Sequence, residues 1–313
     1  MSTEKTQDDV LVVKNLKQYF RVDKKHTVKA VDDVSFSIKR GSTFALVGES
    51  GSGKSTIGKS LIRLYDPTEG SILLDGTEIA GPMTKEKKRF LTGRMQMIFQ
   101  DPMSSLNPRR KVLDIVAEGL DAAHLYHSAA EGLDAAHLYH SAAERREKVY
   151  DILEKVGLSK EQAERYPHMF SGGQRQRIGI ARAMIMEPEL IIADECISAL
   201  DVSTQAQVVN LMREIQEERG LAYLFIAHDL AMAKYIADYV GVIHLGHFVE
   251  MGTKEDIFEH PMHPYTKSLL AAVPEPNPRS KNKVVETYDK DALGIDYEKG
   301  TKKYVSDTHM VLI

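Results

Sequence analysis

The residues best suited to chemistry form one run, Gly48-Glu-Ser-Gly-Ser-Gly-Lys-Ser-Thr56, which fits the pattern G-x-x-x-x-G-K-[ST] completely. Its glycines permit backbone conformations that turn successive N–H groups inward, as a cradle for phosphate oxygens. We expect Lys54 to reach the β- and γ-phosphates of a nucleotide, and the Ser55 hydroxyl to bind Mg²⁺. A glycine-rich connector that matches by chance is the alternative. The nucleotide-binding residues expected here are Gly48, Ser50, Gly51, Ser52, Gly53, Lys54, Ser55 and Thr56.

Two carboxylates follow a second apolar run, Leu190-Ile-Ile-Ala-Asp194-Glu195. Open α/β sheets bind ligands at the carboxyl ends of their strands, where these two side chains emerge. We expect Asp194 to hold Mg²⁺ through water, and Glu195 to polarise the water that attacks the γ-phosphate. An exposed acidic strand end is the alternative, and the phosphate loop in the same chain disfavours it.

A Ser-Gly-Gly turn lies in the run Phe170-Ser171-Gly172-Gly173-Gln174. It is expected to open a helix and to present backbone N–H groups to an anion at the helix N-terminus. The inward face of that helix comprises Ile178, Ala181, Met184 and Ile185. For the turn alone, an ordinary N-capped helix is the simpler interpretation.

Taken together, the three runs resemble the ATP-binding subunits of ABC transporters over about residues 10–280, with FSGGQ where the family more commonly has LSGGQ. The resemblance implies a dimer that binds two ATP molecules, so that one isolated chain has only half-sites. In this dimer, the signature motif of one subunit closes over the ATP held by the phosphate loop of the other subunit. The signature residues here are Ser171, Gly172, Gly173 and Gln174.

The resemblance assigns four further residues. Gln100 matches the glutamine loop that senses Mg²⁺ and the membrane subunits, and Asp201 matches the loop that links the two ATP sites. His228 matches the switch histidine that contacts the γ-phosphate, and it is expected to act in catalysis with Glu195. An aromatic near position 20 should stack on adenine, and the spacing from Leu16 favours Phe20. The expected Mg²⁺ ligands are Ser55, Gln100 and Asp194.

Strands are needed to place these motifs at one edge of a sheet. Short apolar runs predict strands buried on both faces at residues 44–47, 190–193 and 223–227, with a further strand at 240–245. Alternation predicts two more strands, at 10–14 and 33–38. A turn-rich β stretch is expected to about residue 80, followed by a Lys-rich loop.

Two helices are expected beside these strands. One begins near Lys54, stops at Asp66-Pro67, and buries Ile57, Leu61 and Leu64. The other follows Ser203 as its N-cap, ends before Gly220, and buries Val208, Leu211 and Ile215.

The fold expected is α/β, a P-loop NTPase of the ABC ATPase type with a mainly parallel core sheet and an antiparallel β subdomain. No convincing strand pattern occurs between about residues 102 and 180, which predicts a helical subdomain inserted there. The ATPase domain is expected to cover residues 1–258. Residues 259–313 form a C-terminal extension and a tail that is expected to be only partly ordered.

The C-terminal run His263-Pro-Tyr-Thr-Lys-Ser-Leu-Leu-Ala-Ala-Val-Pro-Glu-Pro-Asn-Pro278 resembles the oligopeptide/dipeptide/nickel importer branch, most nearly the second ATP-binding subunit of oligopeptide permeases. A Pro-rich linker is the alternative. The resemblance implies ATP and Mg²⁺ as cofactors, and a peripheral position on the cytoplasmic side of the cell membrane. The implied partners are a second ATP-binding subunit, two integral-membrane permease subunits and an extracellular peptide-binding protein.

Composition narrows the class of protein. The chain has 313 residues and one cysteine, Cys196, so an internal disulfide framework is excluded. Its formal net charge is −4, which gives no reason to expect nucleic-acid binding. No apolar run of about 18 residues is present. Alternatives to oligopeptide import are a dipeptide or nickel importer ATPase, a soluble ABC ATPase acting on DNA or ribosomes, and a non-catalytic nucleotide-binding regulator.

A 13-residue segment, Glu118–Ala130, is repeated letter for letter at Glu131–Ala143. Thirteen residues at about 100° each do not complete whole turns, so the two copies would face different directions in one helix. The repeat brings two histidine pairs at helical spacing, but spacing alone is a weak argument for a metal, and we expect none. These pairs are His124/His127 and His137/His140.

Overall fold

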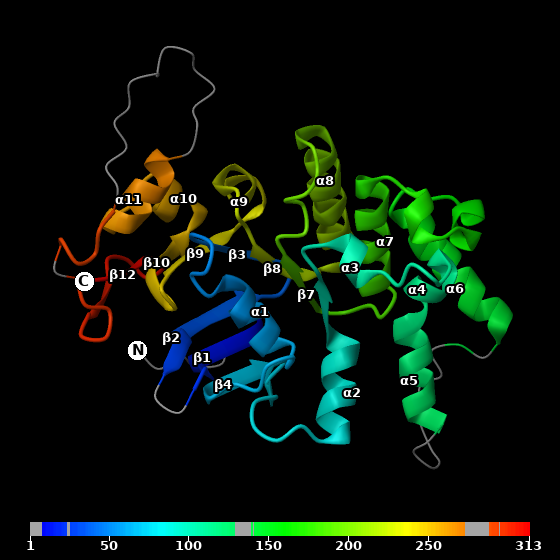
Figure 1. The fold of residues 1–313 in the computed structure, drawn as a ribbon, viewed down its shortest axis with the longest axis horizontal. Coiled ribbons are helices and arrows are strands. Elements are labelled where there is room, and N and C mark those ends of the chain that lie inside the picture. Colours follow the sequence, from blue (N-terminus) through cyan, green and yellow to red (C-terminus); the bar gives the residue numbers. More distant parts are fainter. Residues whose placement is uncertain (1–7, 24–25, 129–138, 140, 273–287, 294) are drawn as a thin grey trace. The chain divides into compact units, whose positions relative to one another are not determined.

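The computed structural model describes residues 8–23, 26–128, 139, 141–272, 288–293 and 295–313. The chain forms two compact units. The first combines residues 1–81 with 223–313, and the second comprises residues 82–222 (Figure 1). The phosphate loop and the C-terminal extension therefore belong to one unit, whereas the carboxylates and the signature motif belong to the other.

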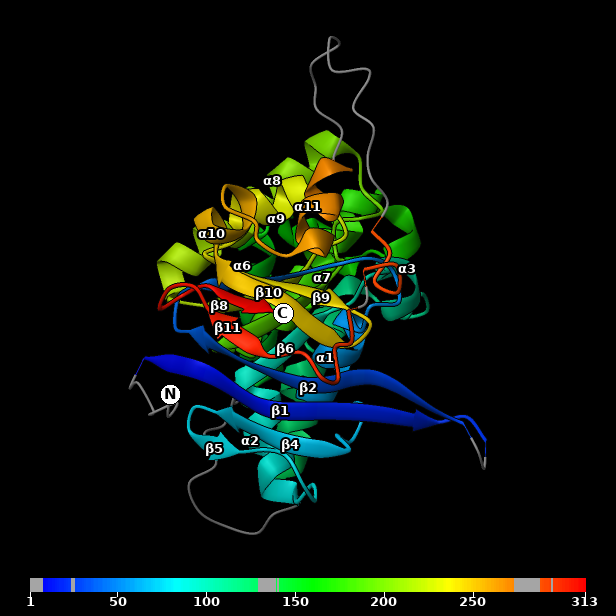
Figure 2. The same cartoon turned by 90° about the vertical axis from the view of Figure 1, so that its left-hand side faces the viewer.

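An antiparallel sheet forms one part of the first unit, and its strands lie side by side in Figure 2. The order is β2-β1-β4-β5, comprising β1 (Asp9–Arg21), β2 (Thr27–Lys39), β4 (Glu69–Leu74) and β5 (Thr77–Glu78). The strands predicted at 10–14 and 33–38 are confirmed and are longer than expected. The antiparallel β subdomain is present.

A second sheet in the first unit carries the phosphate loop. Its order is β11-β12-β10-β9-β3-β8, comprising β3 (Thr43–Val47), β8 (Ala222–Ile226), β9 (Tyr239–His244), β10 (His247–Thr253), β11 (Lys302–Tyr304) and β12 (Met310–Leu312). β3 is parallel to both of its neighbours, β8 and β9. All five residues of β3 are buried, as expected for a strand covered on both faces.

The helices of the first unit are α1 (Lys54–Leu61), α9 (Leu230–Ile236), α10 (Lys254–Phe258) and α11 (Pro264–Ala271). Ile57 and Leu61 of α1 are fully buried, as predicted. The prediction for Leu64 is wrong, because α1 ends at Leu61 and the Leu64 side chain is 58% exposed.

The second unit is mainly helical. Its parallel strands β6 (Met95–Ile98) and β7 (Leu190–Asp194) pair directly. Between them, the described part of residues 102–180 contains helices and no strand, as predicted. The helices of this unit are α2 (Lys85–Arg94), α3 (Pro102–Ser105), α4 (Val112–Val116), α5 (Glu118–Ser128), α6 (Ala142–Lys155), η1 (Lys160–Glu164), η2 (Pro167–Met169), α7 (Gly172–Met184) and α8 (Val202–Arg219).

Two local predictions in this unit are wrong. The Lys-rich segment expected as a loop is helix α2, whose N-cap Thr84 accepts a hydrogen bond from the Lys87 amide at 3.2 Å. Its one buried residue is Leu91, so it lacks the apolar periodicity that marks a helix in a sequence. The N-cap of α8 is Asp201 rather than Ser203, although the predicted inward face and the end before Gly220 are confirmed.

The end of the chain is more ordered than predicted. Met310–Leu312 form strand β12, whose three residues are buried and which pairs with β10. Two ion pairs join the segment before it to β2, from Lys29 to Glu298 at 2.6 Å and from Lys302 to Asp33 at 2.8 Å. Composition alone did not indicate this pairing, because only three consecutive apolar residues carry it.

Glu250 in β10 organises the surroundings of this strand. Its carboxylate is fully buried and accepts hydrogen bonds from the Met262 amide at 2.7 Å and the His263 amide at 3.1 Å. His309 Nε2 lies 2.7 Å from the same carboxylate. A buried carboxylate is tolerated when such donors satisfy it, so Glu250 links the chain before α11 to the chain before β12.

We expect Glu250→Ala to lower the free energy of unfolding by about 3 kcal/mol, because it leaves buried donors without their acceptor. Thermal denaturation of the full chain measures this, with Glu255→Ala as the control, since Glu255 is an exposed glutamate in the first turn of α10. Equal melting temperatures for the two variants would contradict the assigned role of Glu250.

Candidate functional site

The phosphate loop follows β3 and is shaped by its glycines. Gly48 has a φ of 152°, and a Cβ added there would lie 2.2 Å from the Ile243 carbonyl oxygen. Gly53 has a φ of 111°, and its Cβ would lie 2.4 Å from the Ala30 carbonyl oxygen. No other residue fits at either position, so the close backbone packing around this loop depends on both glycines.

Lys54 is the first residue of α1, and its ammonium group lies within the loop. It is 3% exposed, and Nζ donates hydrogen bonds of 2.8 Å to the carbonyl oxygens of Gly48 and Glu49. The Ser52 hydroxyl is buried and has no hydrogen-bond partner among the described residues. A buried cation, an unsatisfied hydroxyl and a helix N-terminus at one loop fit a phosphate group. Ser55 and Thr56 are half-buried, while Ser50 and Gly51 are exposed.

His228 follows β8, at the same edge of the sheet as the phosphate loop. The Ala227 amide donates to the Leu46 carbonyl at 3.0 Å, which aligns the ends of β8 and β3. His228 is exposed, and the next residue, Asp229, caps α9. The structure therefore places His228 and the loop beginning at Gly48 at the carboxyl ends of adjacent parallel strands.

The two candidate aromatics on β1 have different surroundings. The Tyr19 hydroxyl donates to Asp32 at 2.6 Å. The Phe20 ring meets Tyr65 edge to face at 5.1 Å, just beyond the end of α1. Phe20 thus contacts the chain that follows α1. Its role in adenine stacking stays a prediction.

In the second unit, β6 and β7 bring together the predicted glutamine and the carboxylate predicted to act in catalysis. Ile98 pairs with Ala193, and two residues beyond each lie Gln100 and Glu195. Gln100 Nε2 donates to Glu195 Oε2 at 2.7 Å. The sequence did not indicate this hydrogen bond, because the adjacency of β6 and β7 could not be deduced from either run.

The two carboxylates of this unit are held differently. Asp194 is the last residue of β7 and is 3% exposed. Glu195 has a φ of 45°, in the left-handed region that non-glycine residues rarely adopt. The Ser198 hydroxyl and amide both donate to the Glu195 carbonyl, at 2.9 and 3.1 Å. Such a conformation is typical of functional sites, where the surrounding turn holds it in place.

The oxygen atoms of Asp194 and Gln100 are suitable ligands for Mg²⁺, which prefers hard oxygen donors. Cys196, next to the carboxylates, is buried, and burial raises the pKa of its thiol to about 12. A thiol with this pKa is unreactive at neutral pH.

The signature turn is a complete capping box. Ser171 Oγ accepts from the Gln174 amide at 3.3 Å, and Gln174 Oε1 accepts from the Ser171 amide at 3.1 Å. The predicted inward residues of α7 are all buried. Gly173 lies against α8, since a Cβ added to it would be 2.4 Å from Thr204 Cγ2. At Gly172, a Cβ would meet Leu200 Cδ2 at an ordinary 3.6 Å.

We expect Gly173→Ala to destabilise the protein by about 1–3 kcal/mol, because the added methyl overlaps Thr204. Thr204→Ser removes the opposing methyl and keeps the hydroxyl that donates to Asp201. Chemical denaturation of both single variants and the double variant tests the cause. The double variant should recover most of the stability lost in Gly173→Ala, and failure to recover it would contradict a steric origin.

Asp201 begins α8 and is fixed by its own turn. Its carboxylate accepts from the Ser203 hydroxyl at 2.5 Å, the Thr204 amide at 3.0 Å and the Thr204 hydroxyl at 2.8 Å. These hydrogen bonds, that from Ser203 foremost, lower the pKa of Asp201 to about 2. The side chain is therefore ionised throughout the neutral range.

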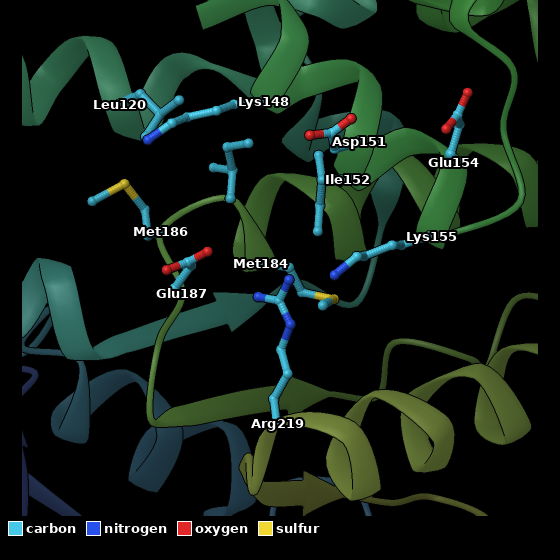
Figure 3. Close-up of a pocket in the computed structure, with 11 residues that line it drawn as sticks. Leu120, Lys148, Asp151, Ile152, Glu154, Lys155, Met184, Met186, Glu187 and Arg219 are labelled. Carbon is cyan, nitrogen blue, oxygen red and sulfur yellow. The ribbon is translucent and has the colours of Figure 1, made fainter. Parts of the chain in front are cut away.

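A cavity of about 680 Å³ in the second unit contains none of the predicted site residues (Figure 3). Side chains of both charges line it, among them Lys148, Asp151, Glu187 and Arg219. It lies among the ends of helices, away from the strand end that carries Asp194. We assign it no part in nucleotide binding.

Two expected absences concern only part of the chain. Among the described residues, no group of histidine, cysteine, aspartate and glutamate side chains is arranged to hold a metal ion. The side chains of the duplicated histidines His124, His127, His137 and His140 lie outside the described residues. In that same described part, no helix combines the length and the apolar character needed to cross a membrane.

Two family models match the chain. One described as ABC transporter covers residues 31–198, which include the phosphate loop, the signature motif and the carboxylates. The other, described as oligopeptide/dipeptide transporter, C-terminal region, covers residues 249–299. The second match includes the run beginning at His263.

Curated relatives are similar over most of the chain. The oligopeptide transport ATP-binding protein OppF of Bacillus subtilis is 55% identical over 90% of this chain and 88% of its own length. OppF of Streptococcus mutans is 51% identical over 96% and 93%, respectively. The dipeptide transport ATP-binding protein DppF of Lactococcus lactis is 48% identical over 96% and 93%.

Solved structures show the same fold. A dimeric, post-hydrolysis state of the ATP-binding cassette MJ0796 bound to ADP and Pi has a TM-score of 0.67 and 26% identity, covering 78% of this chain and 98% of that one. CbiO1 from Clostridium perfringens, part of the ABC transporter complex cbiONQ, has a TM-score of 0.66 and 26% identity over 81% and 92%.

Proposed function

This chain belongs to the ABC transporter family of ATP-hydrolysing subunits, and from that premise we propose that it powers the uptake of oligopeptides across the cell membrane. The observation that carries the proposal is the combination in one chain of the ABC transporter motifs and the oligopeptide/dipeptide C-terminal region. Intact Lys54, Glu195 and His228 favour a hydrolysing subunit over a non-catalytic regulator.

Each motif has a defined task in the proposed reaction. Backbone N–H groups of the phosphate loop and Lys54 bind and orient the phosphates. Glu195 accepts the proton of the attacking water and aligns that water with the γ-phosphate, while His228 contacts the same phosphate. Ser55, Gln100 and a water on Asp194 would hold Mg²⁺, which would supply positive charge near the phosphate oxygens. Phe20 stacks on the adenine ring.

The signature motif supports a dimer as the working state. The ATP held by the partner's phosphate loop would be contacted by Ser171, Gly172, Gly173 and Gln174. The loop at Asp201 would link the two ATP sites. By analogy with the second ATP-binding subunit of oligopeptide permeases, the partner is a different ATP-binding subunit. Two integral-membrane permeases and an extracellular peptide-binding protein complete the proposed complex, and this subunit attaches peripherally to its cytoplasmic side.

A dipeptide importer is the second candidate, because one relative at 48% identity is named for dipeptide transport. The nickel branch and a soluble ABC ATPase have no comparable relative among those described above. The balance between oligopeptides and dipeptides depends on subunits other than this one.

Uptake experiments decide between the two. A strain that lacks this gene should lose uptake of labelled tetra- and pentapeptides and recover it on expression of the chain. Co-purification of the tagged chain should yield two permeases and a second ATP-binding subunit. Loss of dipeptide uptake alone would favour the second candidate. Purification of the tagged chain without any membrane partner would contradict both candidates.

A further inference from the structure

A tyrosine of the C-terminal region contacts the phosphate loop directly. The Tyr265 hydroxyl oxygen accepts a hydrogen bond from the Glu49 amide at 3.0 Å. Glu49 is the second residue of the loop, whereas Tyr265 lies in α11, 216 residues further along the chain and within the region matched at 249–299. We propose that Tyr265 is a positioning residue for ATP binding, through which the C-terminal region sets the conformation of the phosphate loop.

Tyr265 has little freedom to move. Its side chain is 1% exposed, and its ring packs on His244 at 4.2 Å and on Tyr288 at 5.2 Å between centroids. Its own amide donates to His263 Nδ1 at 3.1 Å, which fixes the first turn of α11. A side chain fixed in this way holds its hydrogen-bond partner in one place at little further entropic cost.

The chain before α11 is also anchored. The buried carboxylate of Glu250 accepts from the His263 amide, and β10, which carries Glu250, pairs with β9. β9 in turn pairs with β3, from which the phosphate loop emerges. The Tyr265 hydroxyl therefore closes a ring of contacts that leaves β3 through the sheet and returns to the loop through α11.

Several hydrogen bonds hold the loop, and Tyr265 supplies one of those at its start. The Gly246 amide donates to the Ser52 carbonyl at 2.9 Å, and Lys54 donates to the carbonyls of Gly48 and Glu49. The Lys54 ammonium group has three donors, so it can bind the phosphates as well as these carbonyls. Tyr265 is buried and cannot contact ATP itself, so its contribution is to keep the Glu49 amide in place.

The consequence for binding follows from the fraction of molecules whose loop is ready for phosphate. The apparent dissociation constant equals the intrinsic constant divided by that fraction. When the hydroxyl is lost, the Glu49 amide has to find another acceptor, and the loop samples conformations that cannot hold phosphate. A decrease of the competent fraction to about one fifth would weaken ATP binding about fivefold.

Tyr265→Phe tests the proposal, because it removes the hydroxyl and keeps the ring. We expect the dissociation constant for ATP with Mg²⁺, measured calorimetrically on the full chain, to rise about 5- to 10-fold. In the assembled transporter, KM for ATP should rise while kcat at saturating ATP stays within about twofold, because bound ATP restores the competent loop. Hydrogen exchange of residues 48–53 should be faster than in the wild type.

Tyr297→Phe is the matched control. It also removes a buried hydroxyl from this aromatic cluster, but that hydroxyl bonds to His244 and Tyr288 and not to the loop. It should leave ATP affinity within about twofold of the wild type. If Tyr265→Phe shows the same affinity and the same loop exchange as Tyr297→Phe, the proposal is wrong. An equal loss in both variants would reveal a general packing effect and would also overturn it.

The inference rests on the proposed function, in which this loop binds ATP, and Lys54→Ala separates the two. If Lys54→Ala binds ATP at least about tenfold more weakly than the wild type, while Tyr265→Phe binds like the wild type, only the role of Tyr265 fails. If the wild type and Lys54→Ala show the same ATP affinity, the proposed use of the loop fails, and the role of Tyr265 fails with it.

Discussion

Replacing Glu195 with Gln should lower ATP hydrolysis at this chain's own catalytic site by at least about 100-fold, the lower range for loss of a general base. The amide cannot accept the proton of the attacking water. Its oxygen can still accept the hydrogen bond from Gln100, which measures 2.7 Å in the structure, so the local arrangement should persist. ATP binding should therefore be retained.

The measurement needs the assembled complex, since each ATP site of the proposed dimer combines two subunits. The second ATP-binding subunit should carry the equivalent replacement from the start, so that its own site contributes no hydrolysis. Phosphate release is then compared with and without Glu195→Gln. Glu187→Gln is the control, because Glu187 is an exposed glutamate that also has a positive φ. If the complex with Glu195→Gln hydrolyses ATP within threefold of the complex without it, Glu195 has no catalytic role.

Lys54→Ala should weaken ATP binding by about 10- to 150-fold, the equivalent of one hydrogen bond from a charged group. Lys54 is 3% exposed, so its ammonium group interacts with phosphate without screening by bulk water. The variant also leaves the carbonyls of Gly48 and Glu49 without the donor seen in the structure. Part of the loss will therefore come from the loop itself.

Equilibrium binding of ATP to the full chain measures the effect of Lys54→Ala. Lys59→Ala is the control, because it changes the same residue type in the last turn of the same helix. Thermal denaturation should show both variants folded. A change of less than threefold in the affinity of Lys54→Ala would contradict the assignment of this lysine to the phosphates.

The central elements could be predicted because their signals are local. The buried strand at 44–47, the glycine loop and the helix from Lys54 each follow from adjacent residue types, and the structure confirms them. The roles of Asp194 and Glu195 were assigned from the strand that precedes them, and that strand is confirmed as β7.

The parts that could not be predicted depend on partners far away in the sequence. Strand β12 forms because it can pair with the edge of β10. The two strands are far apart in the sequence, since the contacting residues His309 and Glu250 are separated by 59 positions. The contact between Gln100 and Glu195 requires β6 and β7 to be neighbours. Helix α2 was missed for the opposite reason. It buries so little that the N-cap residue Thr84 is the main local sign of a helix.

The error at the start of α8 has a chemical cause. Ser203 and Asp201 are both good N-cap residues, and sequence alone favours neither. In the structure, Ser203 donates its hydroxyl to Asp201 instead of capping the helix itself. One acidic side chain thus serves both as the cap of α8 and as the residue expected to link the two ATP sites.

The placement of β3 between β8 and β9 bears on how the protein is made. In the finished sheet Leu46 is opposite Ile226, so the phosphate-loop strand is translated 180 residues before its neighbour. At a typical ribosomal rate, that interval lasts roughly 10 to 40 seconds. During this time a strand with four apolar residues out of five has neither of its final partners, and it is a natural segment for a chaperone to shield. The phosphate-loop strand is thus synthesised early in this chain, but it cannot pair with its final neighbours until residues 222–244 have been made.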